Sequence, residues 1–358
     1  MTPEQDIARS LTQRFREAGA QPFDADVLQP AEVLLDLYGE DIRARAFITT
    51  DPIQGEMMLR PDFTVPLVQR HMETRAEPVR YTYSGKVFRK QEDLSGRTAE
   101  YHQVGFELFD GGDRAAADAE VFALFAEVLD GLPVRPVTGD IGILRAAVEG
   151  LETTEARKAA LLRHLWRPAR FKSLLDRFSG RTPVPESRTA LLTQSNPFEG
   201  AGPEIGLRRR SEVEARIATL REDAATLPIS AEDIDRLEAL TALSGTSRDA
   251  LDHLRKLATG QSGLTKAVDH FARRLDAFDA RGIASEALDF EVSFGRTSLE
   301  YYDGFVFGFL AASGSDLPPV ATGGRYDALT AVLGKGRAAP AVGGVIRPGA
   351  ITALEGAT

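Results

Sequence analysis

The stretch Tyr101-His102-Gln103-Val104-Gly105-Phe106-Glu107-Leu108 alternates between two sets of side chains. Successive side chains of a β-strand point to opposite faces, so Tyr101, Gln103, Gly105 and Glu107 share one face of a predicted strand. The other four residues share the second face, which is mostly apolar. This pattern predicts a strand that can pack one face against a core and present polar groups on the other.

Upstream of this strand, the sequence predicts a β-hairpin, a helix and a further strand. Arg45–Thr50 and Glu56–Arg60 are expected to pair across the turn Asp51–Gly55, whose proline and glycine supply the fixed and the permissive backbone that a turn needs. A helix should begin after Asp62, and an aromatic strand should run over Val79–Ser84 and through the residues that follow. The first part of the chain is therefore predicted to be rich in strands.

The middle of the chain has a different composition. From residue 142 to residue 284 it is rich in Ala, Leu, Arg and Glu, and Ser230 precedes a helical spacing of Ile234, Leu237 and Leu240. Strands are expected to return at Leu288–Phe294, Gly304–Ala311 and Val342–Ile346. We therefore predict a split core of residues 1–141 and 285–358, with a helical insertion over 142–284.

Composition and charge exclude several classes of protein. The chain has 358 residues and a formal charge of −10, which argues against wholesale binding of DNA or RNA. The absence of cysteine excludes disulfides, thiolate zinc sites and cysteine nucleophiles. There is no run of about 18 apolar residues and no secretory leader, and Thr2, Pro3 and Gln5 instead predict the start of a helix. We expect a cytoplasmic protein that does not bind a membrane.

Common catalytic signatures are missing from the sequence. The five histidines are dispersed and none has a metal-ligand spacing. Glycine-rich dinucleotide and phosphate loops and the serine nucleophile elbow are also absent. We therefore expect no metal and no cofactor.

Polar and tyrosine side chains instead lie inside or beside the predicted strands, where burial is costly unless they are paired. These residues are Arg60, Asp62, Arg89, Gln103, Glu107, Tyr301 and Tyr302. One interpretation is structural, with Arg89 and Glu107 forming an ion pair while the tyrosines pack. The other is a site for a small zwitterion, because carboxylates can receive an ammonium group and arginine can receive a carboxylate.

Several blocks are similar in order and spacing to the catalytic core of histidyl-tRNA synthetase. They are Leu59–Thr64, Val87–Arg89 with Gly96–Arg97, Tyr101–Glu107, Glu300–Tyr302, Gly323–Asp327 and Pro340–Gly343. The resemblance implies an α+β fold of the class II synthetase type, an antiparallel sheet flanked by helices. It also implies a dimer, with Pro30 resembling the proline of the first class II motif at the dimer interface.

The same resemblance implies a histidine-binding site. Asp62, Thr64 and Gln103 would face the amino group of histidine, and Glu107 and Tyr302 would face its imidazole. Arg89 resembles the motif 2 arginine that holds the amino-acid carboxylate and the α-phosphate, and Tyr301 belongs to the same block as Tyr302.

The nucleotide part of the resemblance is broken. The synthetase arginine that promotes adenylate formation is Thr297 here, and the adjacent Arg296 would point to the opposite face if this segment is a strand. The arginine that clamps the γ-phosphate is Ala350, while Gln91 and Ala99 replace other polar residues of the nucleotide site. Loss of one such contact commonly costs about 10² to 10³ in rate, so we expect no activation of an amino acid by ATP.

A retained amino-acid site and a broken ATP site are typical of the ATP phosphoribosyltransferase regulatory subunits, a synthetase-like family. The chain also stops where a synthetase continues into an anticodon-binding domain, so we expect no tRNA to bind. The resemblance implies a noncatalytic regulatory subunit for the first step of histidine biosynthesis. Such a subunit is needed for the activity of a short-form catalytic partner and mediates feedback by histidine.

Two other functions and one other location stay open. The chain could be an adenylate-forming ligase like histidyl-tRNA synthetase, or a stand-alone amino-acid sensor without a stable partner. The regulatory site could also lie at a subunit interface, because Asp62 is shorter than the usual glutamate and Thr297 removes a cation.

Overall fold

The computed structural model describes residues 2–32, 46–74, 77–91, 98–296, 301–312 and 317–356, and its centre is a nine-stranded sheet. In spatial order the strands are β1 (Gln21–Pro22), β5 (Val79–Phe88), β6 (Glu100–Phe109), β12 (Ala341–Ile346), β11 (Ala321–Arg325), β10 (Phe305–Ala311), β7 (Val134–Asp140), β9 (Asp289–Glu291) and β8 (Ser244–Thr246). β1 pairs with β5 and β7 with β9 in parallel, and the other neighbours are antiparallel. This is the α+β arrangement that the sequence predicted.

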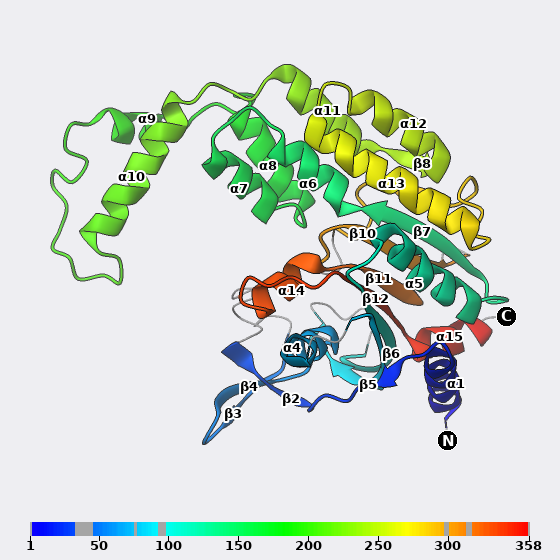
Figure 1. Ribbon diagram of the computed structural model, residues 1–358. Coiled ribbons are helices and arrows are strands. Elements are labelled where there is room, and N and C mark those ends of the chain that lie inside the picture. Colours follow the sequence, from blue (N-terminus) through cyan, green and yellow to red (C-terminus); the bar gives the residue numbers. More distant parts are fainter. Residues whose placement is uncertain are drawn as a thin grey trace.

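One face of the sheet carries the main apolar core. It is covered by α1 (Pro3–Glu17), α5 (Arg114–Val128), α13 (Ser262–Ala280) and α15 (Pro348–Glu355), which Figure 1 shows lying against the strands. Phe125 of α5 lies against Phe307 of β10 with ring centroids 5.2 Å apart, and Phe15 of α1 lies 5.4 Å from Phe106 of β6. Because these aromatic side chains bury one face of the sheet in the core, the other face points toward the remaining helices.

The opposite face of the sheet is rich in glycine and carries the polar residues. We call it the site face and define it by Gly85, Gly105, Gly324 and Gly343, whose missing Cβ atoms leave room for the side chains of neighbouring residues. Helices α4 (Thr64–Thr74) and α14 (Asp327–Leu333) lie at this side and contact each other. The alternation predicted for residues 101–108 is confirmed, since Gln103, Gly105 and Glu107 all lie on the site face.

A small three-stranded sheet precedes α4. Its order is β2 (Leu28–Pro30), β4 (Gly55–Leu59) and β3 (Ile48–Asp51), and β3 and β4 form the predicted antiparallel hairpin. The first residues of the predicted strand Arg45–Thr50 lie outside the described residues. The turn places Gly55 at φ +82°, a conformation that glycine adopts without strain. Asp62 lies just before α4, as expected.

The middle of the chain is helical. Its helices are α6 (Ile141–Glu149), α7 (Glu155–Arg163), α8 (Pro168–Phe178), α9 (Glu186–Thr193), α10 (Arg210–Ala225), α11 (Ala231–Ala242) and α12 (Ser247–Leu257), followed by α13. In Figure 1, α9 and α10 project away from the rest of the molecule. Strand β8 lies within this segment and pairs with β9, a pairing that the sequence did not predict. The division into a core and an insertion over 142–284 stays a prediction.

Several local expectations can be compared directly with the structure. Thr2 caps α1 by accepting a hydrogen bond from the backbone N of Gln5, as predicted. The predicted strand Leu288–Phe294 is shorter, because only residues 289–291 pair as β9. Strands β7 and β11 were not predicted. Within the described part of the chain, no helix has both the length and the apolar character to cross a membrane.

Candidate functional site

Glu107 lies at the centre of the site face and is 1 % exposed. Three hydroxyl groups donate to its carboxyl: Thr64 to Oε1 at 3.0 Å, Tyr83 to Oε1 at 2.9 Å and Tyr326 to Oε2 at 2.7 Å. These residues come from the start of α4, from β5 and from the end of β11, so the site forms only when three separate segments meet. We call these four residues the Glu107 cage.

Two glycines make the cage possible. A Cβ atom on Gly343 would lie 1.6 Å from Glu107 Oε2, and one on Gly105 would lie 2.0 Å from the Tyr83 ring. Gly343 is the β12 partner of Glu107, and Gly105 is the β6 partner of Tyr83. The tyrosine is further held by Phe63, whose ring stacks on it at 4.6 Å. Glu107 and Tyr83 therefore each lie over a glycine of the adjacent strand.

Burial dominates the electrostatics of the cage. It raises the pKa of Glu107 to about 7, although the hydroxyl donors of Tyr326, Tyr83 and Thr64 act in the opposite direction. Burial, with the negative charge of Glu107 nearby, also raises the pKa of Tyr302. A carboxyl group with this pKa can change its charge near neutral pH. It can therefore bind an imidazole, whose own pKa lies in the same range.

Asp62 and Arg89 form a second part of the site. Asp62 is buried, and its Oδ1 accepts a hydrogen bond from the backbone N of Val65 at 3.3 Å. Burial raises the pKa of Asp62, while the positive charge of Arg89 lowers it. Arg89 Nε donates to the carbonyl of Pro61 at 2.8 Å. The charge of Arg89 therefore acts on Asp62. The alternative interpretation, a structural ion pair between Arg89 and Glu107, is wrong, because the carboxyl of Glu107 is held by three hydroxyl groups instead.

Gln103 is a buried polar residue of the site face with an unsatisfied acceptor. It is 1 % exposed, and its Oε1 has no hydrogen-bond partner among the residues that the structure describes. A buried acceptor without a donor costs free energy. The amide therefore has the capacity to accept a hydrogen bond from a bound amino group.

Tyr301 and Tyr302 lie side by side after β9, with ring centroids 4.9 Å apart. Tyr302 is buried and lies over Gly324, where a Cβ atom would come within 2.8 Å of its ring. Tyr301 is partly exposed and packs edge to face against Tyr326 of the cage. The predicted site residues are thus brought together on the site face, where Arg60 also lies over Gly85 and donates to the backbone carbonyl of Lys86.

Positions that differ from the synthetase nucleotide site and lie within the described residues can be placed directly. Ala350 is buried in α15, and Gln91 uses its amide to donate to the carbonyl of Arg89 at 3.1 Å. Arg296 points into the helical middle of the chain, because its Nε donates to the carbonyl of Leu165 at 2.5 Å. Residues 292–296 form turns, so the condition that this segment is a strand is not met at Arg296. Thr297 and the motif 2 residues Gly96 and Arg97 lie outside the described residues.

Sequence reasoning missed three residues of the site. Tyr83 and Tyr326 complete the Glu107 cage, and Arg347 follows β12 at the edge of the site face. Tyr83 precedes Gly85 by two residues on a strand that was predicted, so its face could have been read from alternation. Tyr326 belongs to a block quoted for the resemblance.

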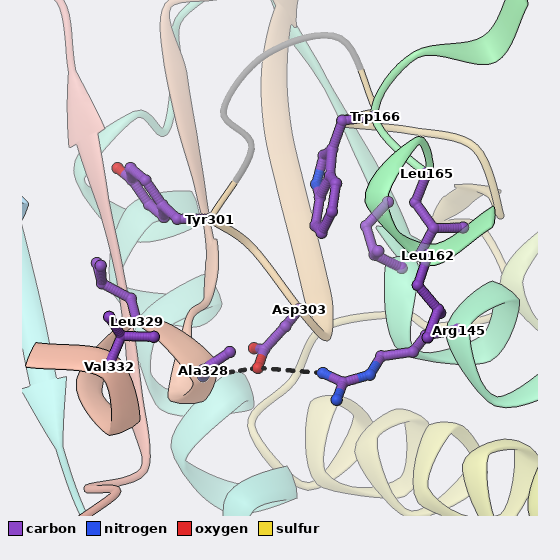
Figure 2. A pocket seen from close by; sticks show the side chains of 10 residues that line it. Arg145, Leu162, Leu165, Trp166, Tyr301, Asp303, Ala328, Leu329 and Val332 are labelled. Carbon is purple, nitrogen blue, oxygen red and sulfur yellow. Dashed lines mark hydrogen bonds and ion pairs between the residues drawn. The ribbon is translucent and has the colours of Figure 1, made fainter. Parts of the chain in front are cut away.

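A cavity of about 260 Å³ lies beside the site, between the helical middle of the chain and α14 (Figure 2). Tyr301 lines it together with Trp166, and Arg145 Nη1 lies 3.8 Å from Asp303 Oδ2. Burial, with the negative charge of Asp327, raises the pKa of Asp303 to about 6. Tyr301 therefore contacts both this cavity and the Glu107 cage.

Across the described ranges, His, Asp and Glu side chains do not gather in groups of three that could hold a metal ion. His71 is buried and stacks on Phe109 at 3.7 Å, and burial lowers its pKa to about 4. This histidine packs as a neutral aromatic ring.

Comparisons with known proteins agree with the fold. Residues 2–202 and 213–351 match the model of the histidyl-tRNA synthetase family. ATP phosphoribosyltransferase regulatory subunits of Brucella canis and Brucella ovis are each 31 % identical to this chain over 376 residues, which cover 98 % of this chain and 97 % of theirs.

Solved structures show the same fold. A Bacillus halodurans protein described as an ATP phosphoribosyltransferase regulatory subunit/histidyl-tRNA synthetase has a TM-score of 0.70 at 23 % identity and covers 98 % of this chain and 78 % of its own. Histidyl-tRNA synthetase from Nostoc sp. PCC 7120 has a TM-score of 0.65 at 17 % identity, covering 99 % of this chain and 72 % of its own. With this class II synthetase fold and full-length similarity to the Brucella proteins, the chain belongs to the family of ATP phosphoribosyltransferase regulatory subunits.

Proposed function

We propose that the chain is a noncatalytic regulatory subunit of ATP phosphoribosyltransferase that binds histidine on the site face. It serves the first step of histidine biosynthesis, where it is needed for the activity of a short-form catalytic subunit and relays inhibition by histidine. The observation that carries the proposal is the Glu107 cage, a buried carboxyl that accepts hydrogen bonds from three hydroxyl groups, in a chain whose nucleotide positions hold Ala350 and Gln91.

Histidine binding follows from the chemistry of the residues. Glu107 and Tyr302 face the imidazole, while Asp62, Thr64 and Gln103 receive the amino group. Thr64 now donates to Glu107, so binding would replace part of this internal hydrogen bonding with bonds to the ligand. Because the cage already satisfies Glu107, only the difference between the two sets of bonds contributes to affinity, and we expect modest binding.

Arg89 receives the carboxylate of histidine in this proposal. Its charge already acts on Asp62, and its Nε donates to Pro61. A ligand that brings an ammonium group to Asp62 and a carboxylate to Arg89 satisfies both charges at once. A zwitterionic amino acid has this charge distribution.

Regulation requires more than binding. Histidine can shift the complex toward an inhibited state only if it binds that state more tightly than the active state. The assembly would contain a dimer of this chain, with Pro30 at the interface between its two copies, and copies of the catalytic subunit. No membrane and no nucleic acid take part.

Co-assembly and titration test the proposal. The chain should copurify with a short-form ATP phosphoribosyltransferase and raise its activity, and calorimetry should show histidine binding that Glu107→Gln weakens at least tenfold. Glu127→Gln, which changes an exposed carboxylate that pairs with Arg14, is the matched control. Pyrophosphate exchange with histidine and ATP would instead establish the ligase, and normal histidine binding by Glu107→Gln would exclude this site.

A further inference from the structure

Arg347 lies at the edge of the site face, between β12 and α15. Its backbone is extended, with φ −106° and ψ 96°, so it continues the strand by one residue. The register pairs Ile346 with Val104, and one further step places Arg347 beside Gln103. Alternation then puts the arginine on the same face as Gly343.

Among the described residues, the guanidinium of Arg347 has neutral hydrogen-bond partners. Nη1 donates to the carbonyl of Pro319 at 2.6 Å, and Nη2 donates to the hydroxyl of Thr322 at 3.2 Å. No carboxylate pairs with this guanidinium within the ranges that the structure describes. A guanidinium carries five N–H donors, so donors remain for a ligand. A partly buried cation without a counter-ion is costly, and an anion bound there would remove that cost.

A second cation acts on Arg347. Burial lowers the pKa of this guanidinium, the positive charge of Arg89 lowers it further, and Tyr101 favours its charged form. Two arginines with like charge therefore share one region of the site face. Next to them lies Gln103, whose buried Oε1 lacks a donor.

We infer that Arg347 is a second anion-binding residue of this site and that, with Arg89, it holds the carboxylate of the bound amino acid. Gln103 Oε1 accepts a hydrogen bond from the ammonium group of the same ligand. Arg347 thereby supplies a positive charge in a chain where Thr297 stands at the position of a synthetase arginine. This inference rests on the proposed function, because it concerns the same ligand.

An amino acid fits this region better than a phosphate group does. A phosphate would satisfy Arg89 and Arg347, but it brings no N–H donor for Gln103 Oε1 or for the carboxyl of Glu107. Histidine brings an ammonium group and an imidazole N–H together with its carboxylate. The side chains on the site face therefore match the two ends of a zwitterion.

The test compares L-histidine with histidinol, which has a hydroxymethyl group in place of the carboxylate. Titration calorimetry should show that Arg347→Gln weakens histidine binding about ten- to a hundredfold and leaves histidinol binding nearly unchanged, the effect expected for one charge-assisted hydrogen bond. Arg347→Lys keeps the charge and should keep most of the preference for histidine. Arg135→Gln, on an exposed arginine that pairs with Asp289, is the matched control and should have no effect.

Thermal unfolding of each variant shows whether it is folded. If folded Arg347→Gln keeps the wild-type ratio of histidine to histidinol affinity, the inference is wrong while the proposed function stands. If the wild-type protein binds neither compound, both are wrong. ATP binding that Arg347→Gln abolishes would overturn the carboxylate assignment and establish a phosphate site.

Discussion

Replacing Glu107 with glutamine should change how the stability of the protein depends on pH. The pKa of this buried carboxyl is raised from 4.5 to about 7, because burial disfavours the charged form. This upward shift of the pKa corresponds to about 3 kcal/mol of unfavourable free energy when Glu107 is ionised in the folded protein. Glutamine is neutral at every pH and keeps an oxygen that can accept hydrogen bonds from the cage hydroxyls.

The direction of the effect follows from proton binding. Between pH 4.5 and about 7, the folded protein holds the Glu107 proton while the unfolded chain has lost it. The free energy of unfolding of the wild-type protein therefore falls as pH rises through this window, and the contribution is fully present only below pH 4.5. In Glu107→Gln this contribution is absent. The variant should gain about 2 to 3 kcal/mol relative to wild type between pH 5 and pH 8.

Urea unfolding of both proteins at pH 5 and pH 8, followed by circular dichroism, measures this gain. Asp303, whose raised pKa of about 6 contributes in the same direction, is present in both proteins and cancels in the comparison. Glu127→Gln removes an exposed carboxylate and should give the wild-type pH dependence within about 0.5 kcal/mol. If the difference in unfolding free energy between Glu107→Gln and wild type is the same at both pH values, the carboxyl is not held neutral in the folded state.

Three further predictions concern other parts of the molecule. Asp118→Asn should lower the unfolding free energy in urea by about 1 to 3 kcal/mol, since Arg274 and Arg325 lose the carboxylate between them but keep Asp140 and Asp327; a loss below about 0.5 kcal/mol would contradict this. Gly105→Ala should cost about 1 to 3 kcal/mol by displacing the Tyr83 ring, and the double variant with Tyr83→Leu should lose less than the sum of the single variants in the same assay. Arg221→Ala should speed amide hydrogen exchange over Glu186–Thr193, because this arginine binds the carbonyl groups of Leu192 and of the following Gln194, while exchange in α13 stays unchanged; equal rates in both proteins would show that the contact is not stabilising.

Local sequence signals placed the elements whose period is regular. The alternation over residues 101–108 correctly placed Gln103 and Glu107 on one face, and the capping residues at Thr2 correctly placed the start of α1. Both signals depend only on residues within a few positions of each other. They need no knowledge of what packs against the element.

Strand β11 shows why other elements escaped prediction. Its residues Ala321–Arg325 include two glycines, which are uncommon in strands because they weaken them. The structure requires them: a Cβ atom on Gly323 would lie 2.2 Å from the ring of Phe307, and one on Gly324 would lie 2.8 Å from Tyr302. These contacts come from distant positions in the sequence, so the reason for the glycines is visible only in the assembled sheet.

The partners of Glu107 escaped for the same reason. Thr64, Tyr83 and Tyr326 lie 43, 24 and 219 positions away from it along the chain. Sequence alone showed that this carboxyl would be buried or would bind a ligand, but not which donors would reach it. The family resemblance supplied Thr64 as a site residue, yet assigned it to the amino group of a ligand rather than to the carboxyl.

The charges on the site face also decide between an amino-acid site and a nucleotide site. Acidic Glu107 and basic Arg347 lie at opposite ends of a region that runs along β6 from Glu107 to Gln103, four residue steps or about 13 Å at the usual rise of a strand. Gln103 lies beside the basic end with an acceptor that still needs a donor. A triphosphate would need cations along its whole length and would meet an acidic group at one end. A zwitterion with an N–H donor at its far end satisfies Glu107, Gln103 and Arg347 together. Amino-acid binding without ATP is therefore consistent both with the missing synthetase arginines and with the presence of Arg347.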